Sequence, residues 1–125
     1  MKALVKKARL DLIPARVLRF VAKAFEYGEQ FYARWNWRLG DNCYSTYYGA
    51  AKRHMDKWYE CEGKGFRGSY DEESGVHHID CAIASLMILR DLTLMREGAV
   101  GVDTSIDDDR PKFMVERLRE QKEDN

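Results

Sequence analysis

The sequence predicts an all-α fold, a small bundle of three main helices with a short C-terminal helix. Apolar residues recur at alternating spacings of three and four in several segments, as on one face of a helix. The 125-residue chain has only two prolines, and no segment of useful length alternates apolar and polar residues as a half-buried strand would. Three helices of this length enclose a thin core, so we expect a homodimer or higher homo-oligomer to complete the bundle.

The first helix is expected directly after Pro14 and the second over residues 45–61. Gly40 and the pair Asp41-Asn42 are stop and turn signals between them. The apolar stripe of the first helix comprises Val17, Leu18, Val21, Phe25, Gly28 and Tyr32. The stripe of the second comprises Tyr47, Ala51, His54, Trp58 and Cys61.

The third helix is expected to begin near Glu72 or Ser74 and to run to about Glu97. It is apolar nearly all round from residue 79 to residue 89, which is typical of a central, buried helix. A loop-like segment follows, and Pro111 favours the start of a short helix. We therefore expect one helical domain, residues 1–110, and a short charged C-terminal helix or tail, residues 111–125.

The composition excludes several classes of protein. Lys and Arg total 21 and Asp and Glu total 21, and this balance argues against a nucleic-acid polymer as partner. No run of 18 apolar residues predicts a membrane span, and the first residues lack the pattern of a signal peptide. The three cysteines are odd in number and far apart, which favours reduced thiols and a cytoplasmic location.

A glycine-rich segment, residues 63–68, matches the pattern G-x-G-x-x-G. The dinucleotide-binding fingerprint needs a preceding strand, whereas here a helix precedes it. The segment is therefore either a flexible helix connector or a mobile basic loop. In the second case Lys64 and Arg67 contact substrate phosphates.

Acids and histidines cluster at the expected start of the third helix. On a helix, Glu73, His77 and Asp80 fall at positions i, i+4 and i+7, so they share one face. Such an oxygen–nitrogen–oxygen set suits Mg²⁺, Mn²⁺ or another divalent ion. Asp71 is either a further ligand or a helix cap. Glu62, at the end of the second helix, is expected near the same ion.

Several of these residues have a second interpretation. Asp80 lies among apolar neighbours, where an ionised carboxylate needs either a metal ion or a cation such as Arg53. His77 and the adjacent His78 point about 100° apart on a helix, so one of them packs or holds a carboxylate. His54 lies on an apolar stripe and is either a core residue or a ligand.

The order of short motifs resembles the dATP/dGTP diphosphohydrolase N-terminal family, which we relate to the all-α MazG-like nucleotide pyrophosphohydrolases. The resemblance spans about residues 9–90. It rests on Asp11-Leu12-Ile13-Pro14, Tyr27-Gly28, Tyr32, Asn36-Trp37, Arg53-His54, Glu62, Asp71, Glu73-Ser74-Gly75 and His77-His78. The chain departs from the family after the paired histidines, where Asp80 and Cys81 replace an Ala and a His, and in a longer loop before Asp71.

The resemblance implies hydrolysis of a deoxypurine nucleoside triphosphate to the monophosphate and pyrophosphate, with Mg²⁺ or Mn²⁺ as cofactor. Taken together with the cluster of acids and histidines, it predicts Glu73, His77 and Asp80 as catalytic residues and metal ligands, and Glu62 and Asp71 as further metal ligands. Glu26 and Glu29, an E-x-x-E pair, are the alternative ligand set. The implied contacts to substrate come from Arg53, His54, Lys64, Arg67, Asn36 and Trp37. The location is then the cytoplasm, of the host cell if a phage encodes the protein. A noncatalytic helical binding or regulatory module of a phage is the alternative.

Overall fold

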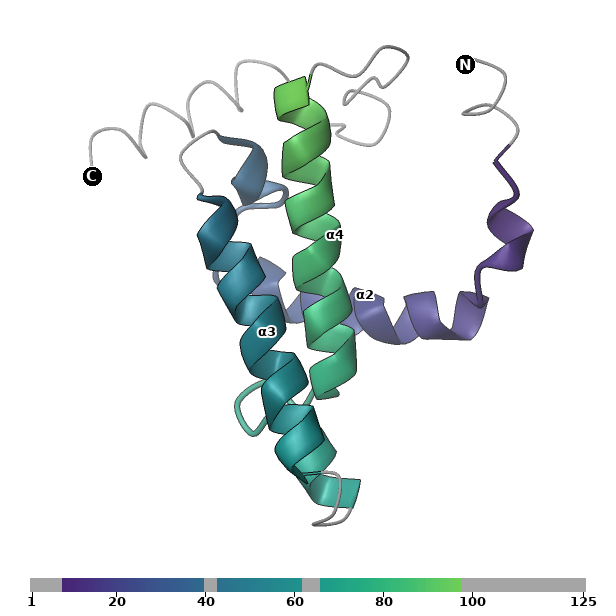
Figure 1. Ribbon diagram of the computed structural model, residues 1–125, viewed down its shortest axis with the longest axis vertical. Coiled ribbons are helices and arrows are strands. Elements are labelled where there is room, and N and C mark those ends of the chain that lie inside the picture. The colour runs from purple at the N-terminus through teal and green to yellow at the C-terminus, as the bar shows by residue number, and fades with distance from the viewer. Residues whose placement is uncertain (1–7, 40–42, 62–65, 98–125) are drawn as a thin grey trace.

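The computed structural model describes residues 8–39, 43–61 and 66–97 (Figure 1). They form three α-helices: α2 (Ala15–Glu29), α3 (Tyr44–Cys61) and α4 (His78–Glu97). Three short 3₁₀ turns accompany them: η1 (Leu10–Leu12), η2 (Asn36–Leu39) and η4 (Phe66–Ser69). Within these ranges, strand-like pairing is limited to one isolated bridge between Tyr70 and His77. The predicted all-α class is confirmed.

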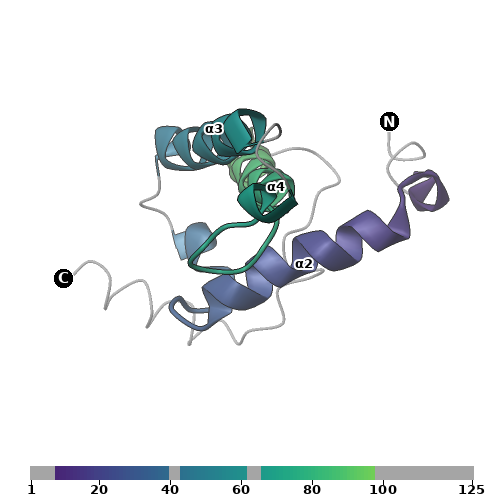
Figure 2. The ribbon, with the colours of Figure 1, turned by 90° about the horizontal axis from the view of Figure 1, so that it is seen from below.

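Helix α4 lies between the other two helices. It runs alongside α3, with which it shares its largest interface, and α2 crosses its opposite side (Figure 2). The core is built from small and medium side chains that allow close approach of the helices, as Ala51 on α3 and Ala82 and Ala84 on α4 show. Val21 supplies the buried position of α2.

Proline sets the start of α2, as the sequence predicts. Pro14 is extended at φ −65° and ψ 109°, and the helix begins at the next residue. The carbonyl of Pro14 accepts hydrogen bonds from the N–H groups of Val17 and Leu18, which closes the first turn. A proline tolerates this position because it loses no backbone hydrogen bond there.

A buried ion pair fastens η2 to the second half of α4. The Arg38 Nε and Nη2 atoms donate to the two carboxylate oxygens of Asp91 at 2.8 and 3.1 Å. Trp37 Nε1 donates to Asp91 Oδ2 at 2.7 Å, and its ring packs against Phe25 of α2. The Arg38 residue is only 7% exposed, so this contact joins the core rather than the surface.

The start of α4 differs from the prediction. The helix begins at His78, and residues 71–77 form a turn that contains Gly75 at φ +73°, a left-handed conformation that favours glycine. The turn is closed by hydrogen bonds from Gly75 N–H to the Asp71 carbonyl and from Asp71 N–H to the Val76 carbonyl. Glu73 and His77 therefore do not lie on a helix, and the expected common helical face of residues 73, 77 and 80 is wrong.

The burial of α4 also differs from the prediction. Although its sequence is apolar nearly all round, Leu86 is 51% exposed and Met87 is 45% exposed. Large apolar side chains of α4 are thus exposed in the part of the chain that the structure describes. The expected helix at residues 111–125 and residues 63–65 of the glycine-rich segment lie outside the described residues. No described helix is long and apolar enough to cross a membrane.

Candidate functional site

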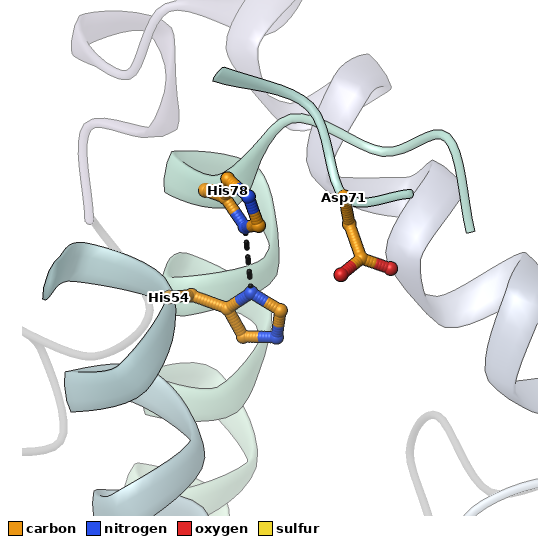
Figure 3. Close-up of side chains that lie close together, drawn as sticks. All are labelled: His54, Asp71 and His78. Carbon is orange, nitrogen blue, oxygen red and sulfur yellow. Dashed lines mark hydrogen bonds between the residues drawn. The ribbon is translucent and has the colours of Figure 1, made fainter. Parts of the chain in front are cut away.

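Three side chains converge where α3, α4 and the loop before α4 meet. His54 comes from the middle of α3, His78 is the first residue of α4, and Asp71 lies in the loop (Figure 3). One potential ligand atom of each lies within 4.8 Å of the others. The Nδ1 atoms of the two histidines are 3.0 Å apart. The residues comprise two imidazoles and one carboxylate, a set able to hold a divalent metal ion.

Asp71 is held in place by Ser74. The Asp71 Oδ2 atom accepts hydrogen bonds from the backbone N–H and from the hydroxyl of Ser74, both at 2.9 Å. Burial opposes ionisation of Asp71, but these two hydrogen bonds and the nearby histidines outweigh it, so the pKa of Asp71 lies below its ordinary value. The carboxylate is therefore ionised at neutral pH and oriented before any ligand binds.

The two histidines are held in the neutral form. Burial lowers the pKa of His54, and the nearby His78 lowers it further, although Asp71 partly compensates. Burial also lowers the pKa of His78, which is 5% exposed. Neutral imidazole is the form that binds metals. Burial thus favours the form of both imidazoles that can donate a lone pair to a metal ion.

A cleft of about 660 Å³ opens on the other side of the 71–77 loop, between α2 and the start of α4. Aromatic and polar side chains line it. They include Phe20 and Tyr27 of α2, Tyr70 and His77 of the loop, and Asp80 and Ile83 of α4. The rings of Tyr70 and His77 meet edge to face at 5.1 Å. The cleft thus presents aromatic rings together with several charged and polar side chains.

Tyr27 and Glu73 connect the cleft with the cluster of His54, Asp71 and His78. The Tyr27 hydroxyl donates to Glu73 Oε1 at 3.2 Å. Burial, this hydrogen bond and the charges of Glu73 and Asp71 raise the pKa of Tyr27. Because the Asp71 charge acts on Tyr27 as well as on the histidines, the cleft and the cluster share one electrostatic environment.

The predicted acids and histidines fall into two groups. Asp71 and His54 lie in the cluster, whereas His77 and Asp80 line the cleft. Within the described parts of the chain, Asp80 forms neither the ion pair with Arg53 that was the alternative to a metal ion nor another ion pair, and partial burial raises its pKa. Glu26 also lines the cleft, close to Lys23, whose Nζ lies 3.4 Å from Glu26 Oε2.

The remaining predicted residues are spread more widely. Trp37 is bound to Asp91, thirteen residues after His78 on α4, which is about 20 Å along the helix axis at 1.5 Å per residue. Asn36 begins the same η2 turn. Arg53 is exposed on α3, beside His54. Glu62, Lys64 and the Arg67 side chain lie outside the described part of the structure.

Two residues of this region were missed from the sequence. The sequence left open which of the paired histidines packs, and only His77 was named as a ligand, yet His78 supplies a donor atom of the cluster. Lys57 lies one helical turn after His54, and its charge lowers the pKa of both clustered histidines. The signal for Lys57 was the Arg53-His54 motif, because His54 lies three residues before Lys57 on α3.

Comparison with known proteins agrees with the motif resemblance. The family model for the dATP/dGTP diphosphohydrolase N-terminal domain matches residues 1–101, which include all three cluster residues and the cleft. No curated protein and no solved structure matches the chain. Because the match covers most of the sequence, the chain belongs to the dATP/dGTP diphosphohydrolase N-terminal family.

Proposed function

We propose that this protein hydrolyses dATP or dGTP to the monophosphate and pyrophosphate with the help of Mg²⁺ or Mn²⁺. The family points to a diphosphohydrolase of this substrate class. The observation that carries the proposal is the meeting of His54, Asp71 and His78 beside an aromatic-lined cleft. Hydrolysis of a nucleoside triphosphate needs a site that binds a divalent ion next to a cleft that binds the nucleoside.

The cluster fits a divalent ion by its donors. Among the described residues the hydrogen bonds to the Asp71 carboxylate reach Oδ2, which leaves Oδ1 as a donor toward an ion. When bound, the ion would neutralise phosphate charge and make a coordinated water more acidic. His54, Asp71 and His78 would hold it there.

The other residues of the region have separate roles in this proposal. The charges of Lys57 and Arg53 reach His54, so both cations stand where they can attract phosphate oxygens. The purine ring would lie in the cleft against Tyr27 or Tyr70, since aromatic rings stack on any base. Glu73 would orient the Tyr27 hydroxyl.

Removal of a proton from the attacking water is assigned to the cleft side of the loop. His77, Glu73 and Asp80 are the candidates there. Partial burial raises the pKa of Asp80, which makes it a stronger base than an ordinary carboxylate. The water oxygen bonds to phosphorus, the α–β phosphoanhydride bond breaks, and pyrophosphate leaves.

We also propose that the protein acts as a homodimer or a higher homo-oligomer. Ile79, Ile83 and Leu86 follow each other at spacings of four and three, so they form one stripe on α4. Leu86 and Met87 extend this stripe beyond the cleft, and both are strongly exposed. On α2, Phe20 is 62% exposed. A second copy of the chain would cover these side chains.

Product analysis tests the proposed reaction. The protein is incubated with each common deoxynucleoside triphosphate and Mg²⁺ or Mn²⁺, and phosphorus NMR distinguishes pyrophosphate from orthophosphate. We expect pyrophosphate from dATP or dGTP. Asp71→Asn should slow the reaction by about 100-fold or more, as with loss of a preorganised charged group. Asp56→Asn, which removes an exposed acid of α3, should have no effect. Release of orthophosphate, or no turnover of any nucleotide, contradicts the proposal.

A further inference from the structure

The donor atoms of the cluster distinguish between kinds of divalent ion. Mg²⁺ prefers an octahedron of oxygen ligands and keeps several waters, whereas imidazole nitrogen suits first-row transition metals. Here two of the three donors are imidazole nitrogens, from His54 and His78, and only Asp71 supplies oxygen. The composition of the cluster thus favours an ion other than Mg²⁺.

The distance between the two nitrogen donors also suits a transition-metal ion. An ion bonded to two nitrogens at about 2.1 Å, with a right angle between the bonds, separates those nitrogens by about 3.0 Å. The Nδ1 atoms of His54 and His78 are 3.0 Å apart. A carboxylate oxygen of Asp71 lies within 4.8 Å of a ring nitrogen of each histidine. The planes of the two rings are tilted by 37° to each other, and their centroids lie 5.3 Å apart.

The surroundings hold the donors in position. His78 is 5% exposed and is the first residue of α4, so packing against α3 restricts its ring. Asp71 is oriented by Ser74, and the Ser74 hydroxyl in turn accepts the N–H of Val76 at 3.2 Å. Hydrogen bonds that orient a ligand in this way are the usual support of metal sites.

We propose that His54, Asp71 and His78 bind a first-row transition-metal ion, Mn²⁺, Co²⁺ or Zn²⁺, in preference to Mg²⁺, and that the ion fastens α3 to α4. This deepens the proposed function because it names the ion that the same loop would hold. The competing explanation is a hydrogen bond between two neutral imidazoles, one acting as donor and the other as acceptor. That arrangement requires no metal and predicts no preference among ions.

Metal binding is measured without nucleotide. The protein is stripped with a chelator, and Cys43→Ser serves as background because the exposed Cys43 thiol can itself bind soft metals. Thermal unfolding is followed with equal concentrations of Mn²⁺ and Mg²⁺, and Co²⁺ binding is followed by its visible ligand-field absorption. We expect Mn²⁺ to raise the melting temperature by mass action where Mg²⁺ does not. Equal shifts with both ions, or no shift with either, overturn the proposal.

Variants identify the ligands. His54→Gln should weaken Mn²⁺ binding by more than tenfold and change the Co²⁺ absorption. Loss of a group that only orients a ligand already lowers metal affinity by about 10–100-fold. His54 is partly exposed, so this variant is better suited than a change of the buried His78. His77→Ala is the matched control, because His77 is adjacent in sequence but faces the cleft. Loss of the Co²⁺ absorption in His77→Ala and its retention in His54→Gln would show the ligand assignment to be wrong.

The metal-binding experiment tests the metal site independently of nucleotide hydrolysis. Mn²⁺ binding that depends on His54, in a protein that turns over no nucleotide, supports the metal site and contradicts the proposed function. Pyrophosphate release with Mg²⁺, in a protein whose stability and Co²⁺ absorption do not depend on His54, supports the function and contradicts the metal site.

Discussion

The Nδ1 atoms of His54 and His78 lie 3.0 Å apart, although the two residues are 24 positions apart and belong to different helices. This contact joins the centre of α3 to the first turn of α4. Two cationic imidazoles at this distance would repel each other, so at least one ring is neutral. The contact adds to burial in lowering the pKa of His54, whereas burial and the charges of Lys57 and His77 lower the pKa of His78.

Without metal, acid should destabilise the protein through these histidines. Their pKa in the folded state is lowered, so the unfolded chain binds more protons below its ordinary histidine pKa of about 6.5. Their contribution to stability is therefore complete above that pH and is lost as the pH falls toward the folded-state values. The charge of Asp71 opposes this loss of stability because it raises the pKa of both histidines. Lys57 lowers the pKa of both, and Arg53 and His77 further lower the pKa of His54 and His78, respectively.

Denaturant unfolding at several pH values between 7 and 5, in the presence of a chelator, measures this loss. His54→Gln should reduce the pH dependence, whereas Asp56→Asn should leave it unchanged. The range stays above pH 5 because the raised pKa of Asp80 acts in the opposite direction near the ordinary carboxyl pKa of 3.8. A pH dependence that is the same in His54→Gln and the parent would contradict the role assigned to the pair.

Ser74 should control metal affinity without touching the ion. Ser74→Ala removes the hydroxyl that donates to Asp71 Oδ2 and accepts from Val76 N–H. The carboxylate then loses part of its orientation, and we expect Mn²⁺ affinity to fall by about 10–100-fold in calorimetric titration. Ser45→Ala, an exposed serine in the first turn of α3, is the matched control. Unchanged affinity in Ser74→Ala would mean that Asp71 is not a ligand or needs no support.

Asp91 should matter for stability rather than for chemistry. Asp91→Ala deletes the acceptor of two Arg38 hydrogen bonds and of the Trp37 indole. A guanidinium that is 7% exposed then loses its carboxylate, and we expect a loss of about 3–5 kcal/mol in the free energy of unfolding. Asp56→Ala, at an exposed position, should cost less than about 0.5 kcal/mol. Similar denaturation curves for the two variants would contradict this assignment.

Leu86 should control self-association. It is 51% exposed on α4, so Leu86→Lys costs the monomer little buried area but places a charge in the proposed interface. Light scattering after size exclusion should give an oligomer for the parent and a smaller species for the variant. Tyr59→Lys changes an exposed apolar side chain of α3 and should not alter the mass. A monomeric parent at the highest attainable concentration would exclude the interface.

Local patterns in the sequence predict two helices well. The periodic stripes and Pro14 lead to α2 and α3 within a few residues of their observed bounds. The start of α4 was placed too early because acids before an apolar run favour a helix N-terminus. In the structure, the positive φ of Gly75 and the hydrogen bonds from Ser74 to Asp71 stabilise a turn there instead.

The site could be predicted only in part for the same reason. Asp71 and His54 were recognised as candidates, but spacing along one helix pointed to His77 and Asp80 as their companions. The pairing of His54 with His78 is a tertiary contact between α3 and α4, which no local spacing encodes. Likewise, an apolar run indicates burial of α4 but cannot say whether this chain or another copy covers Leu86.

Substitution of Asp80 tests whether this carboxylate has a catalytic or a structural role. A structural ion pair would make Asp80→Asn strongly destabilising, by about 3–5 kcal/mol, because the partner charge would be left buried. In the described residues no such pair forms, and partial burial raises the pKa of Asp80, so its charge is unfavourable in the fold.

We therefore expect Asp80→Asn to be as stable as the parent, or more stable, in denaturant unfolding at pH 7 with a chelator. Hydrolysis of dATP or dGTP should nevertheless fall by about 100-fold, since the variant keeps the shape of the cleft wall but loses a base. Asp56→Asn should change neither quantity. A destabilised Asp80→Asn that retains full turnover would assign Asp80 to the structure, because the neutral amide would then serve the reaction as well as the carboxylate does.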